Sequence, residues 1–199
     1  MDFSRQMSVF AVEKFQDKRI DVIGSGAVGS HIVLGLAKIG LTNIHVWDHD
    51  VVNSHNLPNQ TFFASHVDPK EVHEEKRVKK VDALAEVVKK MTGTEIVVHP
   101  EKYQGQEKLG QIVFLLVDSM AERKKIWQAS LKLKLNVECL IETRMSALAG
   151  RVYTLCPCQY SHYTEWEKTL CKDKDAGRSA CGIIPSIQPT ASLVASMAV

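Results

Sequence analysis

The feature that most constrains the fold is Gly24-Ser25-Gly26-Ala27-Val28-Gly29, which follows the apolar run Arg19–Ile23 and precedes a helical pattern that reaches about Gly40. When a strand enters such a GxGxxG turn and leaves it as a helix, the first glycine allows the tight turn. The second lets a phosphate approach, and the third lets helix and strand pack closely. The helix N–H groups then face the anion. We therefore predict a nucleotide-binding loop, with a tight turn that binds nothing as the alternative.

Strand and helix patterns alternate along the rest of the chain. Strands are expected at 19–23, 43–47, 95–99, 112–117 and 138–143, and helices at 5–15, after residue 26, and at 71–91, 121–133 and 191–199. This alternation is typical of a parallel sheet covered on both faces. No linker or repeat divides the chain, so we expect one doubly wound, mostly parallel α/β domain over residues 1–199 with a Rossmann-like nucleotide-binding half. A long loop excursion is expected at 156–182, before the last helix, and the natural chain is expected to continue past Val199.

Composition argues against several classes of partner. The chain has 25 Lys+Arg and 23 Asp+Glu, a formal charge of +2, which gives no electrostatic reason to expect nucleic acid or a membrane surface. Its longest apolar runs, such as Ile112–Val117, are far shorter than the roughly 18–20 residues of a membrane span. The first residues show no basic region followed by an apolar stretch, so no export signal is expected, and the five cysteines are an odd number. A reduced, cytoplasmic compartment is therefore expected.

An acidic residue should end the second strand and bind the ribose hydroxyls of a nucleotide. Asp48 stands there, 19 residues after Gly29. Taken alone, Asp48 could equally cap a helix or lie in a solvated turn. An NAD-dependent oxidoreductase would share these features, but no hydride-acceptor site follows in the sequence.

The segment from Asp48 through Asp50, Asn56 and Asn59 to Gln60 reads DHDVVNSHNLPNQ. It resembles the DxDxVxxxNLxRQ signature of the ThiF/MoeB and ubiquitin-activating enzyme superfamily. Further segments resemble family motifs in the same order along nearly the whole chain: Phe3–Gln6 (YxRQ), Lys76 (the ATP-contacting lysine), Val117–Arg123 (TDNxxxR) and Cys181–Pro185 (the entry to the last long helix).

The resemblance implies that the chain adenylates the C-terminal glycine of a ubiquitin-like or sulfur-carrier protein that ends in Gly-Gly. Adenylation of a peptide or of a modified tRNA base is the alternative substrate class. A carboxylate that attacks the α-phosphorus of ATP needs neutralisation of charge more than acid–base chemistry. By resemblance, Lys76 and Arg5 supply that charge and Asp118 holds Mg²⁺. The remaining nucleotide contacts are expected from Asp48, Asp50, Asn56, Asn59 and Gln60.

Each of these residues also has a structural interpretation, and one departs from the signature. Lys76 could lie on a solvated helix face, and Asp118 could cap the next helix. The arginine of NLxRQ is Asn59 here, and loss of a fixed cation should slow adenylation unless Arg123, Lys70 or Arg77 replaces it. A catalytically inactive module that binds a nucleotide or a partner therefore stays open.

The cysteines suggest two further roles. Family members often bind zinc through CxxC pairs, whereas Cys156-Pro157-Cys158 is a CxC whose spacing alone does not support zinc. Zinc would need a further ligand from Cys171, Cys181 or His162. Cys171 and Cys181 are also candidates for a nucleophile that takes the activated carboxyl as a thioester or persulfide, with purely structural roles as the alternative.

The N-terminal segment predicts assembly. By resemblance, Arg5 crosses a two-fold interface and reaches the ATP of the other subunit. The segment also carries more apolar positions than one helix face needs within its own domain, namely Met7, Val9, Phe10, Val12 and Phe15. We therefore expect a homodimer with composite sites. A monomer is the alternative.

Overall fold

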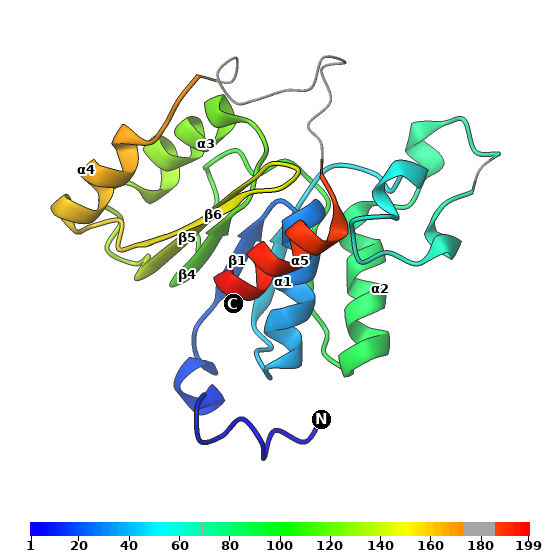
Figure 1. Cartoon of the computed structure of the whole chain (residues 1–199), viewed down its shortest axis with the longest axis horizontal. Helices are drawn as coiled ribbons and strands as arrows, with labels where there is room; N and C mark the ends of the chain where they lie inside the picture. Colours follow the sequence, from blue (N-terminus) through cyan, green and yellow to red (C-terminus); the bar gives the residue numbers. More distant parts are fainter. Residues whose placement is uncertain (69, 173–185) are drawn as a thin grey trace.

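The protein is built on one twisted sheet, which we describe from a computed structural model for residues 1–68, 70–172 and 186–199. Within these residues the strand order is β3-β2-β1-β4-β5-β6, and β6 alone runs antiparallel to its neighbour (Figure 1). The strands are β1 (Ile20–Ile23), β2 (Ile44–Trp47), β3 (Val97–His99), β4 (Ile112–Leu115), β5 (Cys139–Met145) and β6 (Gly150–Leu155). This arrangement confirms the doubly wound α/β class.

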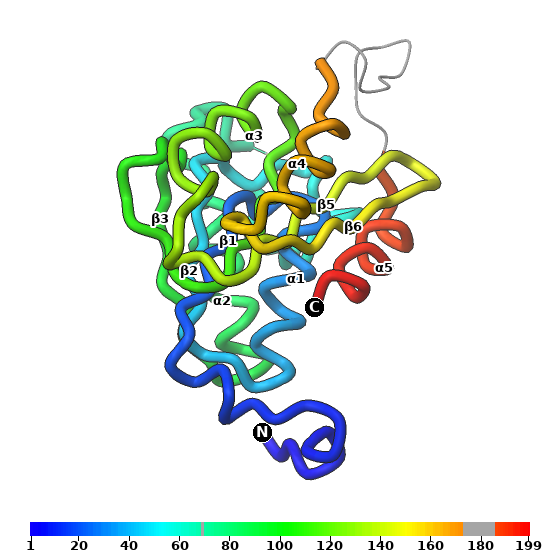
Figure 2. The backbone as a smooth tube through the Cα atoms, turned by 90° about the vertical axis from the view of Figure 1, so that its left-hand side faces the viewer, coloured from blue at the N-terminus to red at the C-terminus, as the bar shows by residue number. Residues whose placement is uncertain are grey.

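Helices cover both faces of the sheet (Figures 1 and 2). One face carries α1 (Ala27–Lys38), α2 (Lys80–Thr92) and α5 (Gln188–Ala198), and the other carries α3 (Met120–Ile126), its π-helical continuation η5 (Trp127–Leu131) and α4 (Tyr160–Lys168). Short 3₁₀ helices are η1 (Val12–Phe15), η2 (Ser54–Asn56), η3 (Ala64–His66) and η4 (Glu74–Lys76). No helix in the described ranges is long and apolar enough to cross a membrane.

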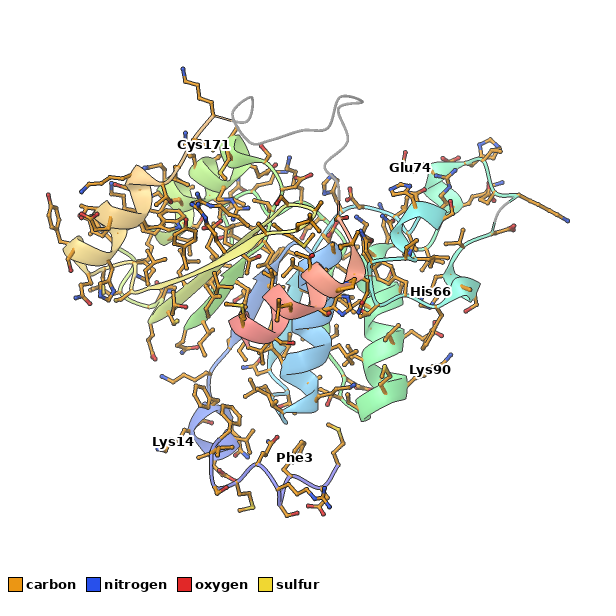
Figure 3. The ribbon with its side chains drawn as sticks, in the orientation of Figure 1. Phe3, Lys14, His66, Glu74, Lys90 and Cys171 are labelled. Carbon is orange, nitrogen blue, oxygen red and sulfur yellow. The ribbon has the colours of Figure 1, made fainter. Side chains whose placement is uncertain are left out.

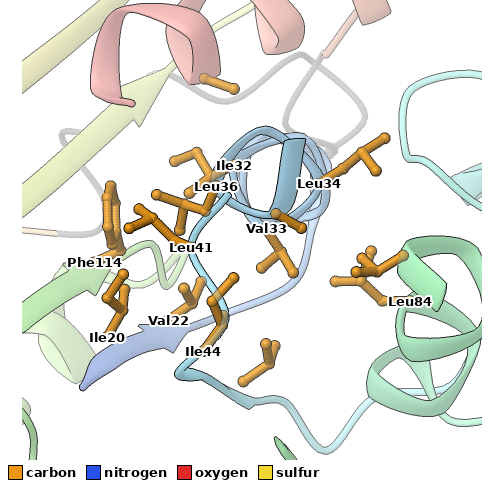
Figure 4. Packing of buried hydrophobic residues seen from close by; sticks show 14 of the residues in the cluster. Ile20, Val22, Ile32, Val33, Leu34, Leu36, Leu41, Ile44, Leu84 and Phe114 are labelled. Carbon is orange, nitrogen blue, oxygen red and sulfur yellow. The ribbon is translucent and has the colours of Figure 1, made fainter. Parts of the chain in front are cut away.

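Alternate side chains along the strands point to opposite faces of the sheet and pack in two separate cores. Val22 points into the core beneath α1, whereas its neighbour Ile23 points into the core beneath η5 and α4. Figure 4 shows Ile32 and Val33 of α1 close to Val22. Burial of a side chain of this size contributes roughly 1.5–3 kcal/mol, so α1 is held firmly on the sheet.

The helix expected at 71–91 is wrong in its first half, because α2 begins at Lys80. The segment before it is extended at Lys79, which forms an isolated antiparallel bridge with Val51. The two apolar residues of the segment, Val72 and Val78, are exposed, so a helix over residues 71–79 would have no apolar stripe to bury.

Two other expectations also change. Residues 5–15 form turns followed by η1 rather than one helix, because the chain bends to place Phe3 and Val12 against Gly40 at the end of α1. The change after Gly150 is not loss of regular structure: β6 pairs with β5, and α4 lies inside the expected excursion at 156–182 and buries Tyr163 and Trp166.

A buried polar network ties the second half of the fold together. The carboxylate of Glu142, with 0% of its side chain exposed, pairs with Arg123 of α3 and with Arg144 at 3.0 Å, and accepts from Trp166 Nε1 of α4 at 3.0 Å. Arg144 continues to Thr169, which follows α4, through bonds of 2.7 and 2.8 Å. One carboxylate therefore joins β5 to both helices on this face.

Glu142→Ala should destabilise the protein by about 3–5 kcal/mol, because removal of this carboxylate leaves the buried guanidinium group of Arg123 and the partly buried one of Arg144 uncompensated. Glu138→Ala is the matched control, since Glu138 lies in the same region but its side chain is 54% exposed in its pair with Lys18. That change should stay within about 0.5 kcal/mol. Urea unfolding measures both, and equal losses in the two variants would contradict the role of the network.

Candidate functional site

The glycine loop joins β1 to α1 by close contact of backbone with backbone. Gly24 has φ of +103°, and a Cβ there would lie 3.0 Å from the Leu116 carbonyl oxygen. A Cβ on Gly29 would lie 2.1 Å from the Gly24 carbonyl oxygen, which no rearrangement of side chains can relieve. Gly26 differs, since a Cβ there would meet nothing within 4 Å. Open space therefore lies beside Gly26, the residue directly before α1, where a phosphate would approach.

Asp48 holds this loop from the end of β2. Its Oδ2 accepts from the Ser25 backbone N–H at 2.7 Å and from the Ser25 hydroxyl at 2.9 Å, and its Oδ1 accepts from the Asp50 N–H at 2.9 Å. Asp48 is 8% exposed, so it is not a solvated turn residue, and its partner is the glycine loop rather than a helix that it caps. Its carboxylate lies beside the loop, as a ribose ligand would need to.

The end of β4 forms the other wall of the loop. The Leu116 N–H donates to the Ile23 carbonyl at 2.9 Å, so the segment that leads to Asp118 runs along the strand before Gly24. Asp118 itself is exposed. Arg123 fixes this segment, because it is buried and donates to the Leu115 carbonyl at 3.2 Å and to the Val117 carbonyl. The guanidinium group of Arg123 is therefore bonded within the fold and does not replace the cation missing at Asn59.

Lys80 is the basic residue that the sequence analysis missed. It is the first residue of α2, 8% exposed, and its Nζ lies 2.7 Å from Asp50 Oδ2. Lys76, by contrast, is exposed on η4 and lines a pocket of about 330 Å³ together with His66 and Arg77. The signal for Lys80 was its place directly before the apolar-periodic stretch of α2, which the overlong helix prediction hid.

Residues 59–61 gather buried polar atoms that lack partners in the described structure: Asn59 Oδ1, Gln60 Oε1, Thr61 Oγ1 and, on α1, His31 Nε2. They are linked to α1, because the Thr61 N–H donates to Ser30 Oγ at 3.2 Å and His31 hydrogen-bonds the Asn59 backbone. Burial lowers the pKa of His31. Unpaired buried acceptors are costly, so this cluster is suited to a donor from outside the described residues.

Three other candidates, Asn56, Asn59 and Arg77, have hydrogen-bond partners among the described residues. Asn56 is 5% exposed, and its Oδ1 accepts from the Asn53 N–H at 2.9 Å. The Asn59 amide donates to Ser186, just before α5. Arg77 donates to Asn53 Oδ1 at 2.7 Å and to the Glu71 carbonyl. Asn56 thus shapes the loop from within, and Arg77 is engaged away from Asn59.

Arg5 lies far from the glycine loop of its own chain. The N-terminal segment packs at the C-terminal end of α1, where the Gln6 amide donates to the Ile39 carbonyl at 2.7 Å. Figure 3 shows Phe3 and Lys14 below α1, at the opposite end from Cys171. The 12 residues of α1 separate the two ends, about 18 Å at 1.5 Å per residue.

The cysteines are dispersed. Cys171 is half-buried, and its carbonyl accepts from Lys124 of α3 at 2.9 Å; Cys181 lies outside the described residues. Cys156 and Cys158 lie next to each other after β6. Among the described residues, the one group of three or more acidic, His or Cys ligands close enough to share a metal is Asp48, His49 and Asp50. Within the described residues no third ligand lies close enough to share an ion with the CxC pair, and Cys181, a predicted further ligand, lies outside them.

Comparison with protein-family models gives a match to the ThiF family over residues 3–199. Comparison with curated proteins by sequence gives no match. The match covers nearly the whole chain and is to the family that the sequence motifs resemble.

Solved structures share the fold at low sequence identity. The chain is similar to E. coli MccB crystallised with AMPCPP and MccA (TM-score 0.65, 15% identity, 94% of this chain and 55% of that chain). It is similar to PaaA (0.67, 17%, 98% and 58%). It also resembles the E. coli tRNA N6-threonylcarbamoyladenosine dehydratase TcdA (0.63, 15%, 99% and 90%). The chain spans little more than half the length of MccB and PaaA.

The free energy of unfolding should decrease as the pH falls through about 6.5. Burial lowers the pKa of His31, His45 and His99 from 6.5, so the unfolded chain binds more protons in this window. His31→Gln should flatten the dependence measured by urea unfolding between about pH 7.5 and 5.5. His55→Gln, at an exposed position, should leave it unchanged. An unaltered slope in His31→Gln would show that His31 takes no part.

Proposed function

Because the chain belongs to the ThiF family, we propose that it uses ATP to adenylate the C-terminal carboxylate of a small protein or peptide. The observation that carries this proposal is the open face at Gly26, where the start of α1 meets the loop held by Asp48. The crystal structure of MccB with ATP supports the same nucleotide. A ubiquitin-like or sulfur-carrier protein that ends in Gly-Gly is the favoured substrate, and a peptide is the second candidate because MccB is crystallised with MccA.

The chemistry follows from charge. A carboxylate oxygen of the substrate attacks the α-phosphorus of ATP, the bond from that phosphorus to the bridging oxygen breaks, and pyrophosphate leaves. The chain's part is to hold the phosphates on the N–H groups of the glycine loop and to neutralise the charge that develops. Asp48 would hold the ribose, exchanging or sharing its bonds to Ser25.

Asp118 is suited to bind Mg²⁺, because its exposed carboxylate follows the strand end that packs against Gly24 and Mg²⁺ prefers oxygen ligands. When bound, Mg²⁺ would supply positive charge to the phosphates. Arg123 and Glu142 would keep the Asp118 segment in place through the bonds from Arg123 to the strand-end carbonyls.

Lys80 is the lysine that we assign to the phosphates in place of Lys76. Its ammonium group is already buried beside Asp50, two residues from Asp48, whereas the Lys76 side chain is exposed to solvent. An ammonium group held in a site of low dielectric interacts with phosphate more strongly than one in water. The inactive binding module remains the second candidate function, because Asn59 carries no charge.

A homodimer would complete the site. The oxygens of Asn59, Gln60 and Thr61 that have no partner among the described residues can accept hydrogen bonds, and a guanidinium group offers five donors. Arg5 cannot supply them to its own chain, since its segment packs at the far end of α1. Met7 and Val9 of that segment are 64% and 86% exposed, which supports contact with a second copy. We therefore propose that Arg5 acts in the partner's site.

Lys80→Ala should weaken binding of MgATP by about ten- to hundredfold, the cost of a lost hydrogen bond to a charged group. Lys76→Ala is the matched control and should bind within about twofold of wild type, because an exposed lysine contributes little. Calorimetric titration measures both.

Asp118→Ala should abolish ATP–pyrophosphate exchange with a Gly-Gly-ending protein while the circular dichroism spectrum stays unchanged. Preference for NADH over ATP would contradict the proposal; ATP binding without exchange on any substrate would favour the inactive module.

Arg5→Ala and Asp118→Ala should each be inactive alone but recover activity when mixed. After random exchange at equal amounts, half of the dimers contain one Arg5→Ala subunit and one Asp118→Ala subunit. One of the two sites in each mixed dimer is intact, so about a quarter of wild-type activity should return. Pyrophosphate exchange over a range of mixing ratios measures this. If Arg5 acts in its own chain, every site keeps one lesion and no ratio restores activity.

A further inference from the structure

Two thiols meet at the end of the sheet opposite the glycine loop. Cys156 and Cys158 flank Pro157 between β6 and α4, and their Sγ atoms lie 2.9 Å apart. Because β6 runs antiparallel to β5, its last residue, Leu155, pairs with Leu140 near the start of β5. The pair is therefore remote from Asp118, and nothing proposed above uses it.

The two thiols differ in their surroundings. The hydrogen bond with the Cys158 sulfur, and those from the backbone N–H groups of Cys158 and Gln159, lower the pKa of Cys156. Cys158 is exposed, and the hydrogen bond with the Cys156 sulfur raises the pKa of Cys158. Gln159 precedes the first residue of α4, and a helix start favours the thiolate. Cys156 is thus the more acidic of the two thiols.

The surroundings favour reaction between the sulfurs over a metal. No third His, Cys or carboxylate ligand joins the pair within the described parts of the chain at a distance that would let them share an ion. His162 is the nearest candidate, but its Nδ1 accepts from the Cys156 backbone N–H at 3.3 Å. The sulfurs need to approach by less than about 1 Å to reach the disulfide length of about 2.05 Å.

We propose that Cys156 and Cys158 form a reversible redox pair that exchanges with low-molecular-weight disulfides of the glutathione disulfide class. The Cys156 thiolate attacks one sulfur of glutathione disulfide; its S–S bond breaks, and one glutathione leaves as thiolate. Cys158 then loses its proton and attacks Cys156 Sγ, the mixed disulfide breaks, and the second glutathione leaves. The protein dithiol is oxidised by two electrons, and glutathione disulfide is reduced to two thiols.

The disulfide would stiffen the turn between β6 and α4. That turn sets the start of α4, whose Trp166 donates to the buried Glu142. The oxidation state of the pair would therefore bear on the helix that closes the second core. This inference does not depend on the proposed adenylation.

The experiment equilibrates the full chain with graded ratios of reduced to oxidised glutathione, quenches it in acid, alkylates the free thiols and counts them by mass spectrometry with peptide mapping. Two of the five cysteines should lose alkylation together, and the map should place them at Cys156 and Cys158. Cys171→Ser is the matched control and should leave this transition unchanged.

Single variants test the asymmetry. Cys158→Ser, which keeps Cys156, should form the mixed disulfide with glutathione at least about threefold faster near pH 7 than Cys156→Ser does. Each unit of thiol pKa above the ambient pH removes tenfold of the thiolate, and higher nucleophilicity returns about half of that logarithm. Full alkylation of both thiols at every glutathione ratio would overturn the proposal. So would a disulfide that uses another cysteine, or protein that carries one zinc per chain released by modification of this pair.

Discussion

The crossing of two backbone segments at Gly24 and Gly29 is the constraint on which the rest of the structure depends. The first turn of α1 lies so close to the carbonyl of Gly24, the residue directly after β1, that no side chain fits between them. This contact fixes where the helix leaves the sheet, and the end of β4 then packs against the same turn. The β2 end is joined through Asp48. Three parallel strands therefore end against one loop, as expected for a ligand site in an open α/β sheet.

A second constraint acts on the other face of the sheet. Glu142 is surrounded by Arg123, Arg144 and Trp166, and each partner comes from a different part of the chain. A buried network of this kind is stable when every member is satisfied and costly when one is missing. It therefore couples the placement of α3 and α4, and through Arg123 it reaches the strand end that precedes Asp118.

The sequence predicted the elements that have their own periodicity or turn chemistry. The glycine loop, Asp48 and five parallel strands could be placed because each is a local pattern. Lys80, the Glu142 network and the atoms at residues 59–61 that lack partners among the described residues could not, because each depends on which distant segments meet in space. The error at 71–79 has the same origin, because the bridge from Lys79 to Val51 that replaces the expected helix is a tertiary contact. Burial of Arg123 likewise removed it as a replacement for the arginine absent at Asn59.

The three glycines of the loop differ in whether a side chain would fit, and this difference determines what an allele at each position would do. Gly24 and Gly29 are required by the backbone crossing, so their loss would remove the protein itself. Gly26 has φ of −74° and ψ of −148°, and nothing lies within 4 Å of the place where a Cβ would stand. A Gly26→Ala allele would therefore meet no steric clash with the fold, while its methyl group would fill the place where a phosphate would lie. Such an allele would separate the cellular roles of the folded protein from those of its ligand, which a deletion cannot do.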